Sequence, residues 1–118
     1  MSRTFSELLD WQWDRYAPSQ RDWVNLLIHL FAVPMFWIGT LDALGALLFS
    51  GLLHALGALL LMALALFAQA LGNAREKNPP EPYADGWDFA RRAAAEQFVT
   101  FPRFLLSGGW WRNFRESA

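Results

Sequence analysis

The stretch from Trp23 to Ala74 contains no lysine or arginine, and Asp42 is its one acidic residue. All ten basic residues of the chain lie outside this block. An α-helix rises about 1.5 Å per residue, so about 20 apolar residues cross the roughly 30 Å hydrocarbon core of a bilayer. The block is long enough for two such crossings, and it therefore predicts a membrane helical hairpin.

The basic residues in the flanks predict the orientation of this hairpin. They lie on both sides of the apolar block: Arg3, Arg15 and Arg21 before it, and Arg75, Lys77, Arg91, Arg92, Arg103, Arg112 and Arg115 after it. Short flanks rich in lysine and arginine stay on the cytoplasmic side of a membrane. We therefore expect both termini to be cytoplasmic and the lipid bilayer to be the main partner of the chain.

The overall composition narrows the classes of function. A formal net charge of −1 lacks the dominant basic field of nucleic-acid-binding proteins. A chain without cysteine cannot form disulfides, thiolate metal sites or a cysteine nucleophile. The apolar fraction of 54% exceeds the roughly 45–50% of soluble domains, and contact with lipid would account for the excess.

The spacing of apolar residues predicts an all-α fold in a single domain, residues 1–118. We expect an amphipathic helix within residues 1–20, a transmembrane hairpin over residues 21–77, and a linker with interfacial helices over residues 78–118. The two spans run from about 23 to 49 and from about 52 to 72, with Ser50-Gly51 as the turn. The run Asn78-Pro79-Pro80-Glu81-Pro82 cannot be helical and marks the linker.

One stripe of the second span is rich in small residues. At a period of 3.5 residues it comprises Gly51, Ala55, Ala58, Met62, Ala65, Gln69, Gly72 and Glu76. Small residues let two helices approach closely in lipid, where apolar burial favours no particular partner. We therefore expect this stripe to face the first span.

Polar residues gather where the first span begins and the second span ends. Asn25 and His29 are four residues apart and share a helix face, with Gln20 just before them; the second set, on the other helix, is Gln69, Asn73 and Glu76. Antiparallel spans bring both sets to the same membrane face. Polar groups at membrane depth usually face a partner or a wet cavity, so all six residues are candidates for a substrate pocket.

These polar residues also have a purely structural interpretation, and a second histidine lies outside the group. The amides and His29 could simply hydrogen-bond across the hairpin, which would contribute about 0.6 kcal/mol each. His54 lies about 28 Å from Asn73 along the second span, so we expect it near the opposite membrane surface.

The ordered polar residues resemble a known family. The run Gln20-x4-Asn25-x3-His29-x4-Pro34, with Gly72-Asn73-x2-Glu76-Lys77-Asn78-x-Pro80 after the second span, is similar to small membrane proteins related to the yeast-type 2-hydroxy fatty acid dioxygenase. The tail from Glu96 to Trp110 resembles that of a bacterial branch. The resemblance implies histidines that bind Fe(II), oxidative one-carbon shortening of a 2-hydroxy fatty acid with dioxygen, and location in a bacterial inner membrane.

This chain departs from that pattern at two positions. Gln20 and Asn73 stand where the family has histidine, so His29 and Glu76 are the remaining candidates for metal ligands. Ferrous oxygenases commonly use two imidazoles and a carboxylate, and amide oxygens are weak ligands for iron. The sequence therefore predicts a degenerate iron site.

Three functions remain open. The first is a membrane protein that holds a lipid or fatty-acid head group, with Arg21, Arg75 and Lys77 close enough to pair with a carboxylate. The second is an Fe(II)-dependent fatty-acid dioxygenase that uses His29 and Glu76, with Asp22 as a further carboxylate. The third is a non-catalytic membrane module that binds a partner protein; a homo-oligomer is compatible with each.

Overall fold

The computed structural model describes residues 3–117, and this part of the chain is helical without strands. The all-α fold predicted from the sequence is confirmed. Its helices are α1 (Phe5–Tyr16), α2 (Trp23–Gly45), α3 (Leu52–Asn73), α4 (Gly86–Ala95), α5 (Phe101–Leu106) and α6 (Gly109–Glu116). A 3-10 turn, Ala17–Ser19, follows α1, and π-helical turns, Ala46–Ser50 and Glu96–Thr100, extend α2 and α4.

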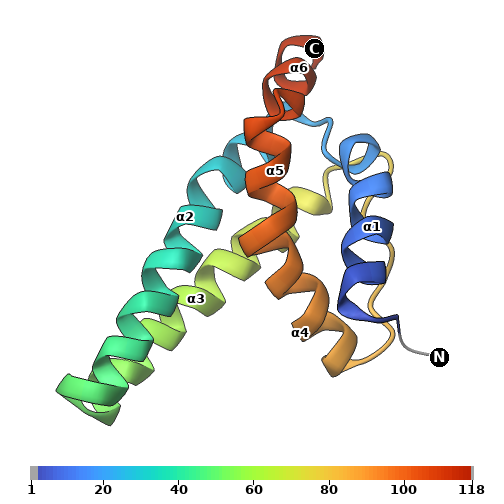
Figure 1. Cartoon of the computed structure of the whole chain (residues 1–118). Coiled ribbons are helices and arrows are strands. Elements are labelled where there is room, and N and C mark those ends of the chain that lie inside the picture. The colour runs from blue at the N-terminus through green and yellow to red at the C-terminus, as the bar shows by residue number, and fades with distance from the viewer. Residues whose placement is uncertain (1–2, 118) are drawn as a thin grey trace.

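Helices α2 and α3 form the long antiparallel hairpin (Figure 1). Together with its π turn, α2 runs over 28 residues and α3 over 22, so both are long and apolar enough to cross a membrane. The connection is the single residue Gly51, whose φ of 96° is accessible to glycine at little cost. The predicted turn and the continuous second helix are therefore confirmed.

The small-residue stripe of α3 faces α2 as predicted. Ala55, Ala58 and Ala65 are buried, although Gly51 at the turn is exposed. At the open end of the hairpin, a Cβ on Gly72 would overlap the Asn25 side chain and lie 3.3 Å from its Cα. Near the middle, a Cβ on Gly39 would lie 3.2 Å from the carbonyl oxygen of Ala58. Glycine at these positions permits the close approach of the two helices.

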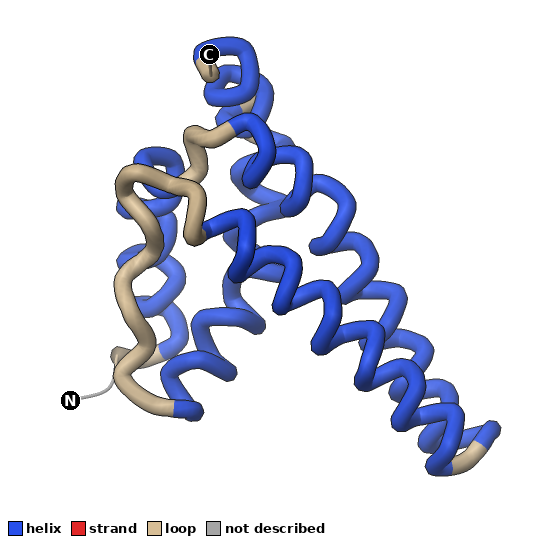
Figure 2. Tube along the Cα trace, turned by 180° about the vertical axis from the view of Figure 1, so that it is seen from behind, coloured by secondary structure: helices blue, strands red, loops and turns tan. Residues whose placement is uncertain are grey.

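The remaining helices form a second arm that diverges from the hairpin, so the molecule has the outline of an inverted V with α6 at its apex (Figure 1). Helices α1 and α4 lie side by side in this arm, and α5 continues from α4 toward the apex. The linker between α3 and α4 is an extended loop that passes alongside α1 (Figure 2). Helix α1 begins with a capping box, in which Thr4 and Glu7 each accept a backbone N–H of the other.

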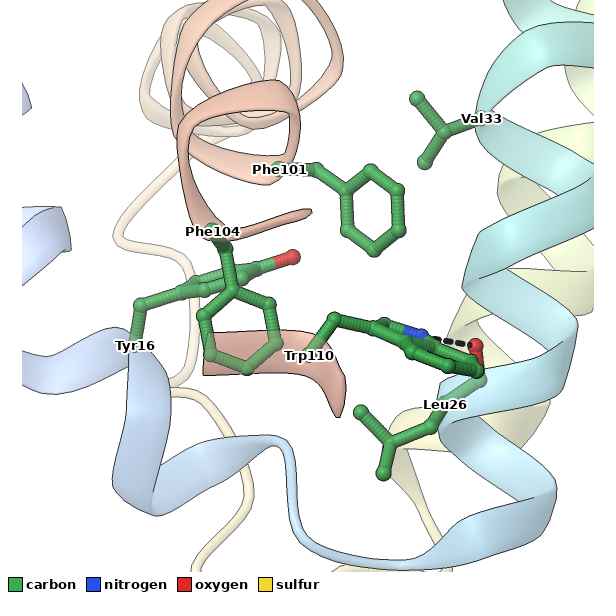
Figure 3. Packing of buried hydrophobic residues seen from close by; sticks show 6 residues of the cluster. All are labelled: Tyr16, Leu26, Val33, Phe101, Phe104 and Trp110. Atoms are coloured by element: carbon green, nitrogen blue, oxygen red, sulfur yellow. Dashed lines mark hydrogen bonds between the residues drawn. The ribbon is translucent and has the colours of Figure 1, made fainter. Parts of the chain in front are cut away.

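An aromatic core joins the second arm to the first half of α2. Figure 3 shows Tyr16, Phe101 and Phe104 meeting Trp110 against α2. The Tyr16 and Phe104 rings meet edge to face with centroids 5.2 Å apart. The indole of Trp110 donates a 2.9 Å hydrogen bond to the Leu26 carbonyl, the dashed line in Figure 3. This core covers only the part of α2 near the open end, so the far half of the hairpin stands alone.

Replacement of Gly72 by alanine tests the close approach at the open end of the hairpin. Because the added Cβ collides with Asn25, we expect Gly72→Ala to lower the free energy of unfolding by about 1–3 kcal/mol. Gly57, with open space around its Cα, is the matched control: Gly57→Ala should be neutral or stabilising. Thermal unfolding of both variants in detergent gives the comparison. Equal stability of the two variants would contradict the predicted helix register.

Candidate functional site

A buried carboxylate joins the two helices at the open end of the hairpin. Glu76, just beyond α3, accepts hydrogen bonds from the backbone N–H groups of Arg21 and Asp22, each at 2.9 Å. It also accepts a 2.7 Å bond from the amide of Asn25. Arg21 and Asp22 precede the first turn of α2, where backbone N–H groups lack helical partners. The Glu76 carboxylate therefore binds the segment that precedes α2, where the Asp22 side chain caps the helix, and fastens this segment to the end of α3.

Two further amides extend this contact into a network, which we call the Glu76 network: Gln20, Asn25, Asn73 and Glu76. The Asn25 amide nitrogen donates to Gln20 Oε1 at 3.1 Å, and the Gln20 amide donates to Asn73 Oδ1 at 3.3 Å. Gln20 and Asn25 are fully buried. The network thus consists of side chains that hydrogen-bond to one another, although Asn25 Oδ1 is buried without a partner among residues 3–117.

A second buried group, the Glu96 cluster, comprises Tyr16, His29 and Glu96. The Tyr16 hydroxyl donates a 2.7 Å hydrogen bond to Glu96 Oε2. His29 Nε2 lies 3.2 Å from the same oxygen, close enough for an ion pair, although its N–H is not aligned as a hydrogen bond. His29 Nδ1 lies 3.1 Å from the Asn25 carbonyl. The cluster joins α1 and α2 to the π turn that follows α4.

The backbone around Glu96 explains how this carboxylate is held. In the π turn, the N–H of Phe101 reaches back to the Glu96 carbonyl, and Pro102 has no N–H to offer. The Gln97 carbonyl is left for the indole of Trp37, which donates to it at 2.6 Å. The side chain of Gln97 forms a reciprocal amide pair with Gln69, at 2.9 and 2.7 Å. Polar contacts therefore dock this segment onto both helices of the hairpin.

The Glu96 cluster shifts the proton affinities of its members. Burial raises the pKa of Glu96, but the His29 ring and the Tyr16 hydroxyl outweigh burial, so the pKa lies below the ordinary value of 4.5. Burial and the adjacent carboxylate raise the pKa of Tyr16 well above 10.0. At neutral pH the cluster therefore holds an ionised Glu96 and a neutral Tyr16.

A cavity of about 570 Å³, which we call the end cavity, opens beyond the Glu76 network. It contains three basic side chains and a tryptophan, and its lining residues are Pro18, Arg21, Asp22, Trp23, Arg75, Glu76, Lys77, Asn78 and Ser117. Arg75 pairs with Asp22 at 2.8 Å, and Arg21 with Glu116 at 3.4 Å. The hydrogen bond from Arg75 holds the pKa of Asp22 below its ordinary range. Among residues 3–117, Lys77 has no ion-pair partner.

A smaller cavity of about 230 Å³, the side cavity, lies between α3, α4 and the linker. Its polar lining includes Gln69, Asn73 and Glu96. Arg92 holds the linker beside this cavity, because its guanidinium donates to the Glu81 carbonyl at 2.6 Å and the Pro82 carbonyl at 3.2 Å. The same guanidinium lies 4.3 Å from the centre of the Tyr83 ring, at a distance typical of a cation–π contact.

The six predicted pocket residues divide between these groups. Gln20, Asn25, Asn73 and Glu76 converge, whereas His29 faces Glu96 and Gln69 pairs with Gln97. His54 pairs with Asp42 at 3.0 Å in the far part of the hairpin, away from both groups. Sequence reasoning missed Tyr16, Glu96 and Gln97. The available signal was the i, i+3, i+4, i+7 spacing of Ala93, Glu96, Gln97 and Thr100, which places them on one buried face.

The residues do not fit an iron centre as they are arranged. Both oxygens of Glu76 accept N–H donors, and these bonds would have to break before the carboxylate could bind a metal. His29 Nε2 faces Glu96 rather than Glu76. Over residues 3–117, no three histidine or acidic side chains lie close enough together to hold a metal ion. The assignment of His29 and Glu76 as metal ligands therefore gains no support from their geometry.

Comparison with protein-family models, curated proteins and solved structures finds no match to this chain. The resemblance to the dioxygenase family therefore rests on the residue pattern alone.

Removal of the Glu76 carboxylate tests whether it closes the hairpin. Glu76→Ala leaves two backbone N–H groups and the Asn25 amide without their acceptor, and each unsatisfied donor costs about 1–3 kcal/mol. We expect a large fall in the thermal midpoint in detergent. Lys77→Ala removes an exposed neighbouring charge and should change the midpoint little. Equal effects of the two substitutions would show that the network does not hold the fold.

The lowered pKa of Glu96 predicts how stability depends on pH. Because the folded state binds this proton less tightly than the unfolded state, ionised Glu96 stabilises the fold at neutral pH. Its contribution is lost as the pH falls below the ordinary value of 4.5 toward the lowered pKa. We expect Glu96→Gln to be less stable at neutral pH and to lose less stability on acidification. Glu81→Gln, at an exposed carboxylate, is the control. If Glu96→Gln loses as much stability on acidification as the unmodified protein, the assignment is refuted.

Proposed function

We propose that this chain is an integral membrane protein that binds the anionic head group of a lipid or fatty acid in the end cavity. The hairpin crosses a bacterial inner membrane, with both termini in the cytoplasm. The observation that carries the proposal is the end cavity, where Arg21, Arg75 and Lys77 surround space at the open end of an apolar hairpin.

The surface of the hairpin supports insertion in a membrane. Large apolar side chains are exposed along both helices and at the tip, where Phe49 is 87% exposed and Leu53 is 85% exposed. Phe31 and Phe67 are likewise exposed farther along the hairpin. A soluble monomer rarely exposes so continuous an apolar surface, whereas lipid tails cover it without cost. The basic residues all lie outside this surface, which favours cytoplasmic termini.

The charges of the end cavity favour an anionic ligand. Arg75 offsets the charge of Asp22, and the N–H donors of Arg21, Asp22 and Asn25 partly screen the charge of Glu76, which weakens the repulsion of an anion. The Arg21–Glu116 pair is about half exposed and is weak in water, which lets Arg21 exchange its partner. Lys77 supplies an additional charge. Trp23, partly exposed at the rim, is the type of side chain that lies at head-group level.

In this proposal, the chain shares a residue pattern with the dioxygenase-like proteins. It binds a lipid or fatty-acid head group instead of catalysing an oxidation with dioxygen. Gln20 and Asn73 hydrogen-bond to each other where the family pattern has histidines. This contact supports a site that has lost metal affinity while keeping its packing. Iron analysis of the purified protein is the corresponding check: stoichiometric iron that is lost in His29→Ala would favour the oxygenase instead.

Binding of oleate to the detergent-solubilised protein tests the head-group site. A basic side chain near an anionic head group contributes about 1 kcal/mol, so Lys77→Ala and Arg21→Ala should each weaken oleate binding about five-fold. Arg91→Ala is the matched control, because Arg91 lies on α4 and does not line the end cavity. Calorimetric titration at low and high salt measures the effect. Equal affinities for all three variants would refute the head-group site.

A further inference from the structure

We propose that the side cavity is a second binding site, for a small neutral amphiphile whose hydroxyl donates a hydrogen bond to Glu96. This cavity shares no lining residue with the end cavity. The inference is therefore independent of the head-group site, and either one can fail without the other.

Glu96 presents one oxygen to the ligand. Its Oε2 atom is occupied by the Tyr16 hydroxyl and the His29 ring. Its Oε1 atom has no hydrogen-bond partner within residues 3–117, and the residue lines the side cavity. The Glu96 side chain is 12% exposed, so a ligand hydroxyl can reach the carboxylate and form a charge-assisted hydrogen bond with it.

The surroundings of Glu96 explain why the ligand is neutral. A ligand carboxylate would meet the lone pairs of the Glu96 oxygens. The guanidinium of Arg92, which holds the linker beside the cavity, already attracts the Glu96 carboxylate, so an ammonium group would gain little net attraction here.

The walls of the side cavity fit an apolar body. They are formed by Leu66 and Ala70 of α3, Phe89 and Ala93 of α4, and prolines of the linker. A water molecule takes about 30 Å³ in the liquid, so about 230 Å³ has room for a ligand of about eight non-hydrogen atoms. Ala70 and Tyr83 are exposed, so the cavity reaches the surface beside the linker. The site thus combines a few polar groups, of which Glu96 is the proposed contact, with apolar walls, as small-molecule sites usually do.

The experiment uses n-hexanol as the probe and the full-length protein in detergent. The chain has two histidines, His29 and His54, so their imidazole signals can be assigned in NMR spectra. A hydroxyl bound to Glu96 weakens the contact between Glu96 and His29. We therefore expect n-hexanol to shift the His29 signal in a saturable way and to leave that of His54 unchanged.

One cavity variant, one control variant and a second probe complete the test. Ala70→Phe fills the side cavity from an exposed position, and it should weaken the n-hexanol response at His29 at least about ten-fold. Ala63→Phe, at an exposed position of α3 outside the cavity, should retain the response. Hexanoate at neutral pH should leave His29 unchanged. Equal shifts of both histidines without saturation, an unaltered response in Ala70→Phe, or an equal response to hexanoate would each overturn the proposal.

Discussion

The structure depends on one constraint: a polar group inside an apolar hairpin must find its partner within the protein. The Glu76 carboxylate meets this constraint for several groups at once. It accepts the N–H groups of Arg21 and Asp22 and one N–H of the Asn25 amide. The start of α2 and the end of α3 are thereby fixed together. The positions of Gln20 and Asn73 follow, because both join the same network.

The same constraint explains how the second arm docks onto the hairpin. Hydrogen bonds add direction to the apolar contacts of the aromatic core and fix which surfaces meet. The indoles of Trp37 and Trp110 donate to carbonyls of Gln97 and Leu26, and the Gln69–Gln97 pair adds two more bonds. These contacts bring Glu96 against His29. The Glu96 cluster is therefore a consequence of docking as much as a site in its own right.

The sequence predicted those parts of the fold that depend on local spacing. The two long helices, the turn at Gly51 and the convergence of Asn25 with Glu76 follow from helical periodicity and antiparallel geometry. The partners of His29 and Gln69 did not follow, because both come from a segment beyond the linker. Arg92 and Glu96 look like solvated charges on an amphipathic helix until that helix is docked. The positions of the helices that follow the proline-rich linker are set by tertiary contacts, which no local sequence pattern encodes.

Hydrogen-bond and ion-pair partners distinguish the residues that hold the fold from those that can bind a ligand. Gln20, Asn25 and Asn73 hydrogen-bond to one another or to Glu76, so the Glu76 network serves the fold, although Asn25 Oδ1 is buried without a partner in the described chain. Groups at the edges of the network also lack partners among residues 3–117: Lys77 has no ion pair, and Glu96 Oε1 accepts no hydrogen bond. A ligand gains free energy where it supplies a partner to a polar group that has none and where it covers apolar walls. The proposed binding sites are therefore the two cavities that border the network, and the network itself holds the hairpin end together between them.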